Sequence, residues 1–95
     1  MKVMTSELNE DALDWAVGQA DACDLAPVEY STKWEFGGPI IEREGISVYF
    51  ENGDWHAKAQ SKPVTYYDYS PLVAAMRCYV ASKFGDDVEI PEELY

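Results

Sequence analysis

Two alternating runs of apolar and polar residues, at 46–51 and 54–59, form the clearest pattern in the chain, and Asn52-Gly53 joins them. Asn-Gly between alternating runs favours a type I′ turn, in which both positions have positive φ, and therefore predicts a β-hairpin. A two-residue loop also fixes which residues face each other. The predicted pairs are Phe50–Trp55, Val48–Ala57 and Ile46–Ala59 on an apolar face, and Tyr49–His56 and Ser47–Lys58 on a polar face. We therefore predict a sheet with one buried side.

Two segments have the 3.6-residue periodicity of amphipathic helices. The first covers about residues 9–21, with Asn9 as N-cap and acidic residues in the first turn. The second covers residues 71–84, where Ser70 is the N-cap and Gly85 ends the helix. The back face of this second helix carries small residues, which are Ala74, Cys78 and Ala81. This pattern predicts a helix that is covered on both sides, by another element or by a second subunit in a homodimer or higher homo-oligomer.

A short helix is predicted over residues 39–44. Gly38 suits the N-cap, Pro39 the first helical position and Gly45 the left-handed C-terminal cap. The preceding residues 22–37 have no clear period and are interpreted as a long connection. Several aromatic side chains in this half of the chain either pack on the core or are exposed for a partner. They are Trp15 in the first helix, and Tyr30, Trp34 and Phe36 in the connection.

The remaining segments complete a small α+β fold. Residues 2–4 fit a short strand, residues 60–69 are interpreted as a loop with three tyrosines, and the acidic tail 86–93 as an extended surface segment. With 95 residues, the chain has room for a single domain, residues 1–95. We predict a small sandwich in which an antiparallel sheet, hairpin 46–59, packs against the two amphipathic helices and the short helix.

Acidic residues outnumber basic residues by 18 to 7, which gives a formal net charge of −11. This balance argues against direct binding to nucleic acid or to an anionic membrane, and no apolar run is long enough to span a bilayer. The N-terminus also lacks the apolar segment of a secretory signal. Residues 1–30 carry −6 and residues 63–95 carry −4, whereas residues 31–62 hold five acids and four bases, or −1. The nearly neutral middle is therefore the favoured place for an anionic ligand.

Residues that carry most enzyme chemistry are sparse. His56 is the one histidine, and no nucleophile motif accompanies it, so it is interpreted as a cross-strand neighbour of Tyr49 and not as a general base. Cys23 and Cys78 have no CxxC spacing, so both are interpreted as reduced thiols, and no metal or cofactor site is predicted. We expect a protein that is not an enzyme, with a hydrolase as the weaker alternative.

Binding fits the residue content better than catalysis. Aromatic faces can stack on a base, arginine can hold phosphate, and glycines let the backbone approach an anion. The candidate ligand site on this basis comprises Tyr30, Ser31, Trp34, Gly37, Gly38, Arg43 and Arg77. The alternative is that the aromatic residues simply fill a small core, and that Arg43 pairs on the surface with Glu42 or Glu44.

Four segments carry a family likeness, namely residues 13–17, 30–32, 37–46 and 71–83. In these segments the chain resembles the NinX family of small proteins encoded by lambdoid phages of enteric bacteria. More distantly, the arrangement is similar to phage sandwich domains of the α-β-α type. The resemblance implies a phage accessory protein made in the cytoplasm of the bacterial host, and it supplies no mechanism. A role in countering host defence is expected by analogy of size and genome context.

Two functions therefore stand as hypotheses. The first is a non-enzymatic protein that sequesters a small anionic or nucleotide-like ligand between the aromatic connection, the short helix and the second long helix, within one chain or across a dimer. The second is an acidic protein-interaction module, or a DNA mimic, that inhibits a basic host protein.

Overall fold

The computed structural model describes residues 1–21, 28–60 and 64–94, and its elements confirm the predicted α+β class. In chain order they are strand β1 (Lys2–Met4), 3₁₀ helix η1 (Thr5–Glu7), helix α1 (Glu10–Ala20), helix α2 (Trp34–Glu44), strands β2 (Ser47–Glu51), β3 (Asp54–Lys58) and β4 (Thr65–Asp68), helix α3 (Pro71–Phe84), strand β5 (Asp87–Glu89) and 3₁₀ helix η2 (Glu92–Leu94). None of the described helices combines the length and the hydropathy that crossing a membrane would need.

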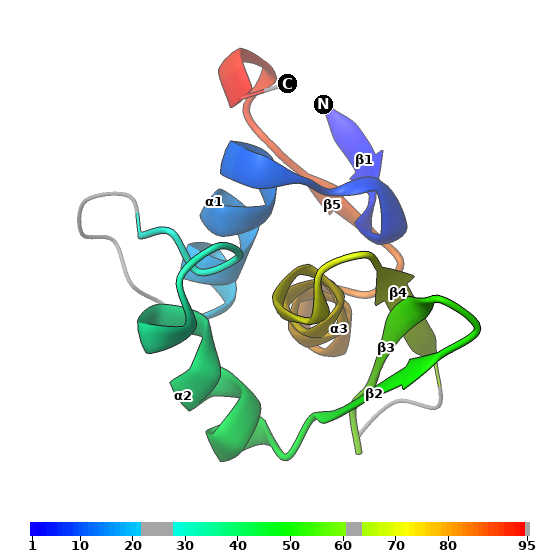
Figure 1. Cartoon of the computed structure of the whole chain (residues 1–95). Helices are drawn as coiled ribbons and strands as arrows, with labels where there is room; N and C mark the ends of the chain where they lie inside the picture. Colours follow the sequence, from blue (N-terminus) through cyan, green and yellow to red (C-terminus); the bar gives the residue numbers. More distant parts are fainter. Residues whose placement is uncertain (22–27, 61–63, 95) are drawn as a thin grey trace.

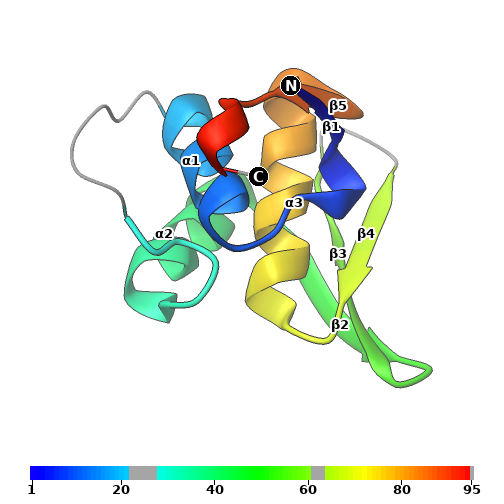
Figure 2. The ribbon, with the colours of Figure 1, turned by 90° about the horizontal axis from the view of Figure 1, so that it is seen from above.

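Helix α3 lies at the centre of the molecule. Figure 1 shows it end on, with α1 and α2 on one side and the three-stranded sheet on the other, and Figure 2 shows the same layers from above. The layers therefore run helix, helix, sheet, and every residue of α3 from Leu72 to Ala81 is buried. The prediction that this helix is covered on both sides is confirmed, and the cover comes from elements of the same chain.

The boundaries of α3 agree with the sequence signals. Ser70 is the N-cap, and its side-chain oxygen accepts a hydrogen bond from the Val73 N–H at 3.3 Å. Gly85 ends the helix with a φ of 91°. For α1, Asn9 occupies the N-cap position, and Trp15 is partly buried against the core, which supports the interpretation that it covers the edge of the core.

The hairpin has the predicted register. Asn52 and Gly53 both have positive φ, and Phe50 lies opposite Trp55 while Tyr49 lies opposite His56. Burial on the apolar face is graded along the hairpin. Ala57 is fully buried beneath α3, whereas Phe50 near the turn is 60% exposed. The hairpin base thus forms part of the core, and its tip presents aromatic side chains to solvent.

The predicted start of the short helix is wrong. Helix α2 begins at Trp34, so Pro39 lies in its second turn and Gly38 is not an N-cap. The proline removes only the hydrogen bond to the Glu35 carbonyl, and both residues are exposed, so water can reach that carbonyl. The predicted C-terminal cap is confirmed, because Gly45 has a φ of 66° in the left-handed region.

The segment interpreted as a loop contains a strand, and the tail predicted to be extended contains another. Within residues 60–69, β4 pairs antiparallel with β3, so the sheet has the order β2-β3-β4. In the acidic tail, β5 pairs antiparallel with β1 in a separate two-stranded sheet. The signal for β4 is the run Thr65-Tyr66-Tyr67, whose β-branched and aromatic residues alternate between exposed and buried. The chain termini meet at the second sheet, where the Met1 ammonium contacts Glu89.

Candidate functional site

Arg43, one of the two predicted phosphate ligands, lies in an acidic cluster at the end of α2. Its Nε donates to Glu44 at 2.9 Å, and its Nη2 donates to Asp21 at 2.8 Å and to the Tyr79 hydroxyl at 3.1 Å. The hydrogen bond to Glu44, together with the one to Asp21, raises the pKa of the guanidinium further above its usual value. Half of the side chain remains exposed, but two carboxylates already neutralise its charge. The alternative interpretation from the sequence, a surface pairing of Arg43 with Glu42 or Glu44, is confirmed for Glu44.

Arg77, the other predicted phosphate ligand, is a buried structural residue of α3. Its Nε donates to the Leu8 carbonyl at 2.8 Å, and its Nη1 donates to the Tyr67 carbonyl at 3.2 Å and to the Asp68 carboxylate at 3.3 Å. Only 7% of the residue is exposed. The guanidinium therefore ties α3 to β4 and to the segment before α1, and it is already engaged by one carboxylate.

The fold places these two arginines on opposite sides of α3. Arg43 contacts Tyr79, which follows Arg77 by two positions and therefore points about 200° away around the helix. Within one chain, the two guanidinium groups cannot hold the same phosphate. The predicted cleft between the connection, α2 and α3 is in this respect not formed, because α3 itself stands between its two cations.

Gly37 and Gly38 have structural surroundings that differ sharply. A methyl group on Gly37 would lie 2.5 Å from the Tyr30 carbonyl oxygen and 2.6 Å from Cδ1 of Leu72, so glycine lets α2 pack closely against α3. A methyl group on Gly38 would meet nothing closer than Trp34 at 3.8 Å. The close backbone approach at Gly37 is therefore to the protein's own core.

The other predicted site residues divide between core and surface. Tyr30 is 7% exposed and Ser31 is 2% exposed, so neither offers a free face to a ligand, whereas Trp34 is 55% exposed at the start of α2. The Ser31 N–H donates to the Asp14 carboxylate at 2.8 Å. Burial raises the pKa of Asp14, and its hydrogen bond with Ser31 opposes that rise. This part of the connection is thus pinned to α1.

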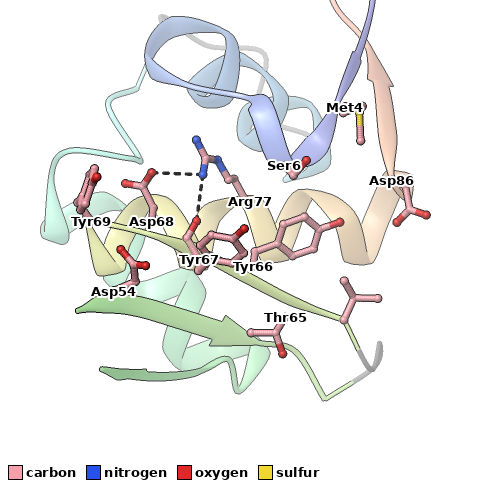
Figure 3. Close-up of a pocket in the computed structure, with 11 residues that line it drawn as sticks. Met4, Ser6, Asp54, Thr65, Tyr66, Tyr67, Asp68, Tyr69, Arg77 and Asp86 are labelled. Atoms are coloured by element: carbon pink, nitrogen blue, oxygen red, sulfur yellow. Dashed lines mark hydrogen bonds and ion pairs between the residues drawn. The ribbon is translucent and has the colours of Figure 1, made fainter. Parts of the chain in front are cut away.

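A cavity of about 620 Å³ opens elsewhere, between the outer edge of β4 and the β1–η1 segment (Figure 3). We call it the β4 cavity. Its lining residues are Met4, Ser6, Asp54, Val64, Thr65, Tyr66, Tyr67, Asp68, Tyr69, Arg77 and Asp86. Tyr66 points toward Asp86 in Figure 3, and burial, followed by the charge of Asp86, raises the pKa of the Tyr66 hydroxyl. The cavity thus combines tyrosines with three carboxylates and one arginine.

Sequence reasoning missed this cavity because it treated residues 60–69 as a loop. The three tyrosines in that segment and the acidic residues on either side of it were the available signal. Arg77 was singled out, but for a site on the other side of α3. The place of Arg77 in the cavity wall depends on the pairing of β4 with β3, which the sequence did not predict.

The outer face of the sheet carries a row of aromatic rings. Tyr49 stacks on His56 with ring centroids 5.2 Å apart, and His56 lies 5.8 Å from Tyr67 on the next strand. The His56 Nε2 atom is 3.2 Å from the Glu51 carbonyl oxygen. The interpretation of His56 as a cross-strand residue is therefore confirmed, and its ring belongs to an aromatic surface that continues onto the β4 cavity through Tyr67.

Cys78 is the cysteine within the described residues, and its thiol is unreactive in the folded protein. Cys78 is buried in α3, and burial raises the pKa of its thiol to about 11, so it is a neutral core side chain, as predicted. Cys23 lies outside the described residues. Among the residues that the structure describes, no three His, Cys, Asp or Glu side chains gather as a metal site.

Comparison with known proteins identifies the family. The family model described as "Bacteriophage P22, NinX" matches residues 26–83, which is more than half of the chain. The chain therefore belongs to this phage protein family. The match spans α2, the three-stranded sheet and most of α3, and it includes the β4 strand and Arg77. A search of curated proteins returned no match.

Proposed function

We propose that this phage accessory protein of the NinX family is a non-enzymatic interaction module that binds a basic segment of a host protein. The observation that carries the proposal is the β4 cavity, whose lining includes three carboxylates, Asp54, Asp68 and Asp86, against a single arginine. The exposed Tyr67 and Tyr69 provide apolar contact area there. A net charge of −11 extends the same preference over the whole chain. Such a surface attracts cations and accelerates encounter with a basic partner.

The electrostatics of the arginines support a cationic partner over an anionic ligand. Arg43 is held by Asp21 and Glu44, and Arg77 is held by Asp68 and two backbone carbonyls. A phosphate would have to displace these partners or share a cation with them, at a cost in desolvation and repulsion. A nucleotide-like ligand, the first hypothesis from the sequence, is therefore the less favoured function.

The side chains that could do chemistry support a non-enzymatic role. The His56 ring is stacked against Tyr49, and the Cys78 thiol is buried with its pKa raised to about 11. An activated nucleophile needs a lowered pKa or an adjacent base, and neither environment supplies one.

The test is affinity capture from a bacterial host lysate with the full-length chain, followed by a binding titration with the purified partner. We expect a partner with a basic isoelectric point, and an affinity that falls steeply between about 50 and 500 mM salt because surface charges are screened. A partner that binds equally well at both salt concentrations, or recovery of acidic partners alone, would contradict the proposal.

A thermal-shift screen distinguishes binding of a nucleotide-like ligand from binding of a basic protein segment. If the chain sequesters a nucleotide-like signal, cyclic dinucleotides at 100 times Kd should stabilise it by about 2.7 kcal/mol. We expect no shift at millimolar nucleotide.

A role against host defence in the host cytoplasm is tested by plating phage with and without the gene on defended and undefended hosts; equal plating ratios on the two hosts would argue against it.

A further inference from the structure

We propose that the β4 cavity receives an extended segment bearing lysine or arginine, which adds a fourth strand to the sheet at the outer edge of β4. This proposal rests on the proposed function, and it specifies the place and the mode of binding. It follows from the direction of backbone groups in β4, from the size of the cavity and from its charge.

The hairpin register shows which backbone groups of β4 face the cavity. In a hairpin with a two-residue turn, the pair next to the turn is hydrogen-bonded and the pairs then alternate, so Tyr49 and His56 also exchange hydrogen bonds. The backbone groups of His56 thus point to β2. Its neighbour on the other side, Tyr67, must then direct its N–H and C=O away from β3, and so must Thr65.

An independent contact supports this direction. The Tyr67 carbonyl accepts the hydrogen bond from Arg77, and Arg77 lines the cavity. Figure 3 shows this bond reaching β4 from the cavity side. The sheet order β2-β3-β4 leaves this edge of β4 without a neighbouring strand in the described chain. The Tyr67 carbonyl is already engaged by Arg77, so the groups that this edge offers for strand addition are the outward N–H groups of Thr65 and Tyr67 and the Thr65 carbonyl.

The cavity has the dimensions of a short strand. Strand β4 has four residues, or roughly 13 Å of extended chain, and an added strand would lie about 4.8 Å from it. Met4 and Ser6 form the opposite wall, and the cavity is open to solvent, with a volume of about 620 Å³ that falls in the range of binding sites. A segment of about three or four residues would fill it.

The charge of the lining selects the occupant. Asp68 is paired with Arg77, and Asp54 forms no ion pair within the described part of the chain. Tyr69, which is 88% exposed, can cover a lysine or arginine side chain by a cation–π contact. A second copy of this chain would place the same aspartates against each other, which disfavours edge-to-edge dimerisation and favours a basic partner.

The test uses the full-length chain and a capped Val-Lys-Val-Lys-Val peptide as the probe. We expect millimolar or tighter binding at low salt, with the largest amide NMR shifts at Thr65 and Tyr67. Two control peptides isolate the two parts of the proposal: Val-Glu-Val-Glu-Val tests the charge, and a lysine peptide N-methylated on the edge that faces β4 tests the backbone pairing. Both should bind at least about tenfold more weakly.

Variants of the protein test the same edge. Thr65→Pro removes an outward N–H at the first position of an edge strand, where proline is tolerated, and should weaken the lysine peptide about tenfold. Asp54→Asn should weaken it about two- to fivefold at low salt. Glu51→Gln is the matched control, because Glu51 pairs with Asp54 in the register but does not line the cavity, and it should change the affinity little. If Thr65→Pro does not fold, Asp54→Asn and the N-methylated peptide still decide the proposal.

The outcomes separate this proposal from the function on which it rests. Peptide shifts centred on other residues, equal binding of the glutamate peptide, or no binding at millimolar lysine peptide would each overturn strand addition at β4. Shifts at residues 65–69 that depend on protein concentration without peptide would indicate a second copy instead, and would also overturn it. In each case, a captured basic partner with salt-dependent affinity would leave the proposed function standing.

Discussion

Replacing Gly37 by alanine tests whether this glycine serves the core or a ligand. The added methyl group would lie 2.5 Å from the Tyr30 carbonyl oxygen and 2.6 Å from Leu72, which is itself buried. Overpacking of this kind costs about 1–3 kcal/mol, and the greater helix propensity of alanine returns about 0.5–1 kcal/mol. We therefore expect Gly37→Ala to lower the free energy of unfolding by up to about 2.5 kcal/mol. For a domain of this size, each kcal/mol lowers Tm by about 4–8 °C.

Gly38→Ala is the matched control in the same helix. Its methyl group would come no closer than 3.8 Å to Trp34, so no core contact opposes it. The greater helix propensity of alanine is offset by the following Pro39, which disfavours helical geometry at a residue with a Cβ, and we expect a change of less than about 1 kcal/mol. Urea titrations followed by circular dichroism, together with thermal melts, measure both variants. If both shift stability in the same direction by the same amount, the packing argument fails. If Gly37 serves ligand approach alone, no packing clash opposes the helix propensity of alanine, and Gly37→Ala should raise the stability of the free protein by about 0.5–1 kcal/mol.

Three further predictions concern buried groups. Arg77→Met should lower the free energy of unfolding by about 2–4 kcal/mol, because two backbone carbonyls and one carboxylate lose their donor; an unchanged urea midpoint would contradict this. Asp14→Asn should match or exceed the parent in stability at pH 7, since the amide oxygen can still accept from the Ser31 N–H. Burial raises the pKa of the Asp14 carboxyl in the folded state, so the folded protein holds this proton more tightly than the unfolded chain does. The stabilisation from the bound proton is present below pH 3.8 and is lost as pH rises through the folded-state pKa. Any advantage of Asp14→Asn should therefore disappear in titrations below pH 3.8. In a Cys23→Ser chain, Cys78 should react with a thiol reagent at pH 8 only as fast as the protein opens, because burial raises its pKa to about 11; rapid labelling without urea would refute the assigned burial.

The parts of the fold that sequence could predict are those specified locally. The Asn52-Gly53 turn and the alternation around it fix the hairpin register, and Ser70 with Gly85 bounds α3. Local sequence signals did not predict where α2 begins. Gly38 and Pro39 are strong local signals for a helix start, but packing of Gly37 against α3 favours a longer helix, and a tertiary contact overrides the local preference.

The candidate site was less predictable than the fold because its contacts are long range. Arg77 was recognised as a cation, but its role depends on the Leu8 carbonyl, 69 positions earlier in the chain. Likewise, β4 is only four residues long, and its identity as a strand depends on pairing with β3. Isolated propensity cannot establish either relationship, since a strand of this length has no stability without its neighbours.

Burial of α3 by its own chain constrains where a partner can bind. The small residues on its back face no longer argue for a second subunit, because α1 and α2 lie on one side of the helix and the three-stranded sheet on the other (Figure 1). Under the proposed function, a basic partner binds at the sheet edge and at the aromatic surface beside it. Arg77 stabilises the fold and also shapes the cavity there, so its replacement would impair stability and binding together. Asp54 is partly buried and forms no ion pair with the residues that the structure describes, and Thr65 lies at the start of β4. Variants at these two positions separate the two effects, because they should retain the parent Tm to within about 4 °C while changing affinity for a basic segment.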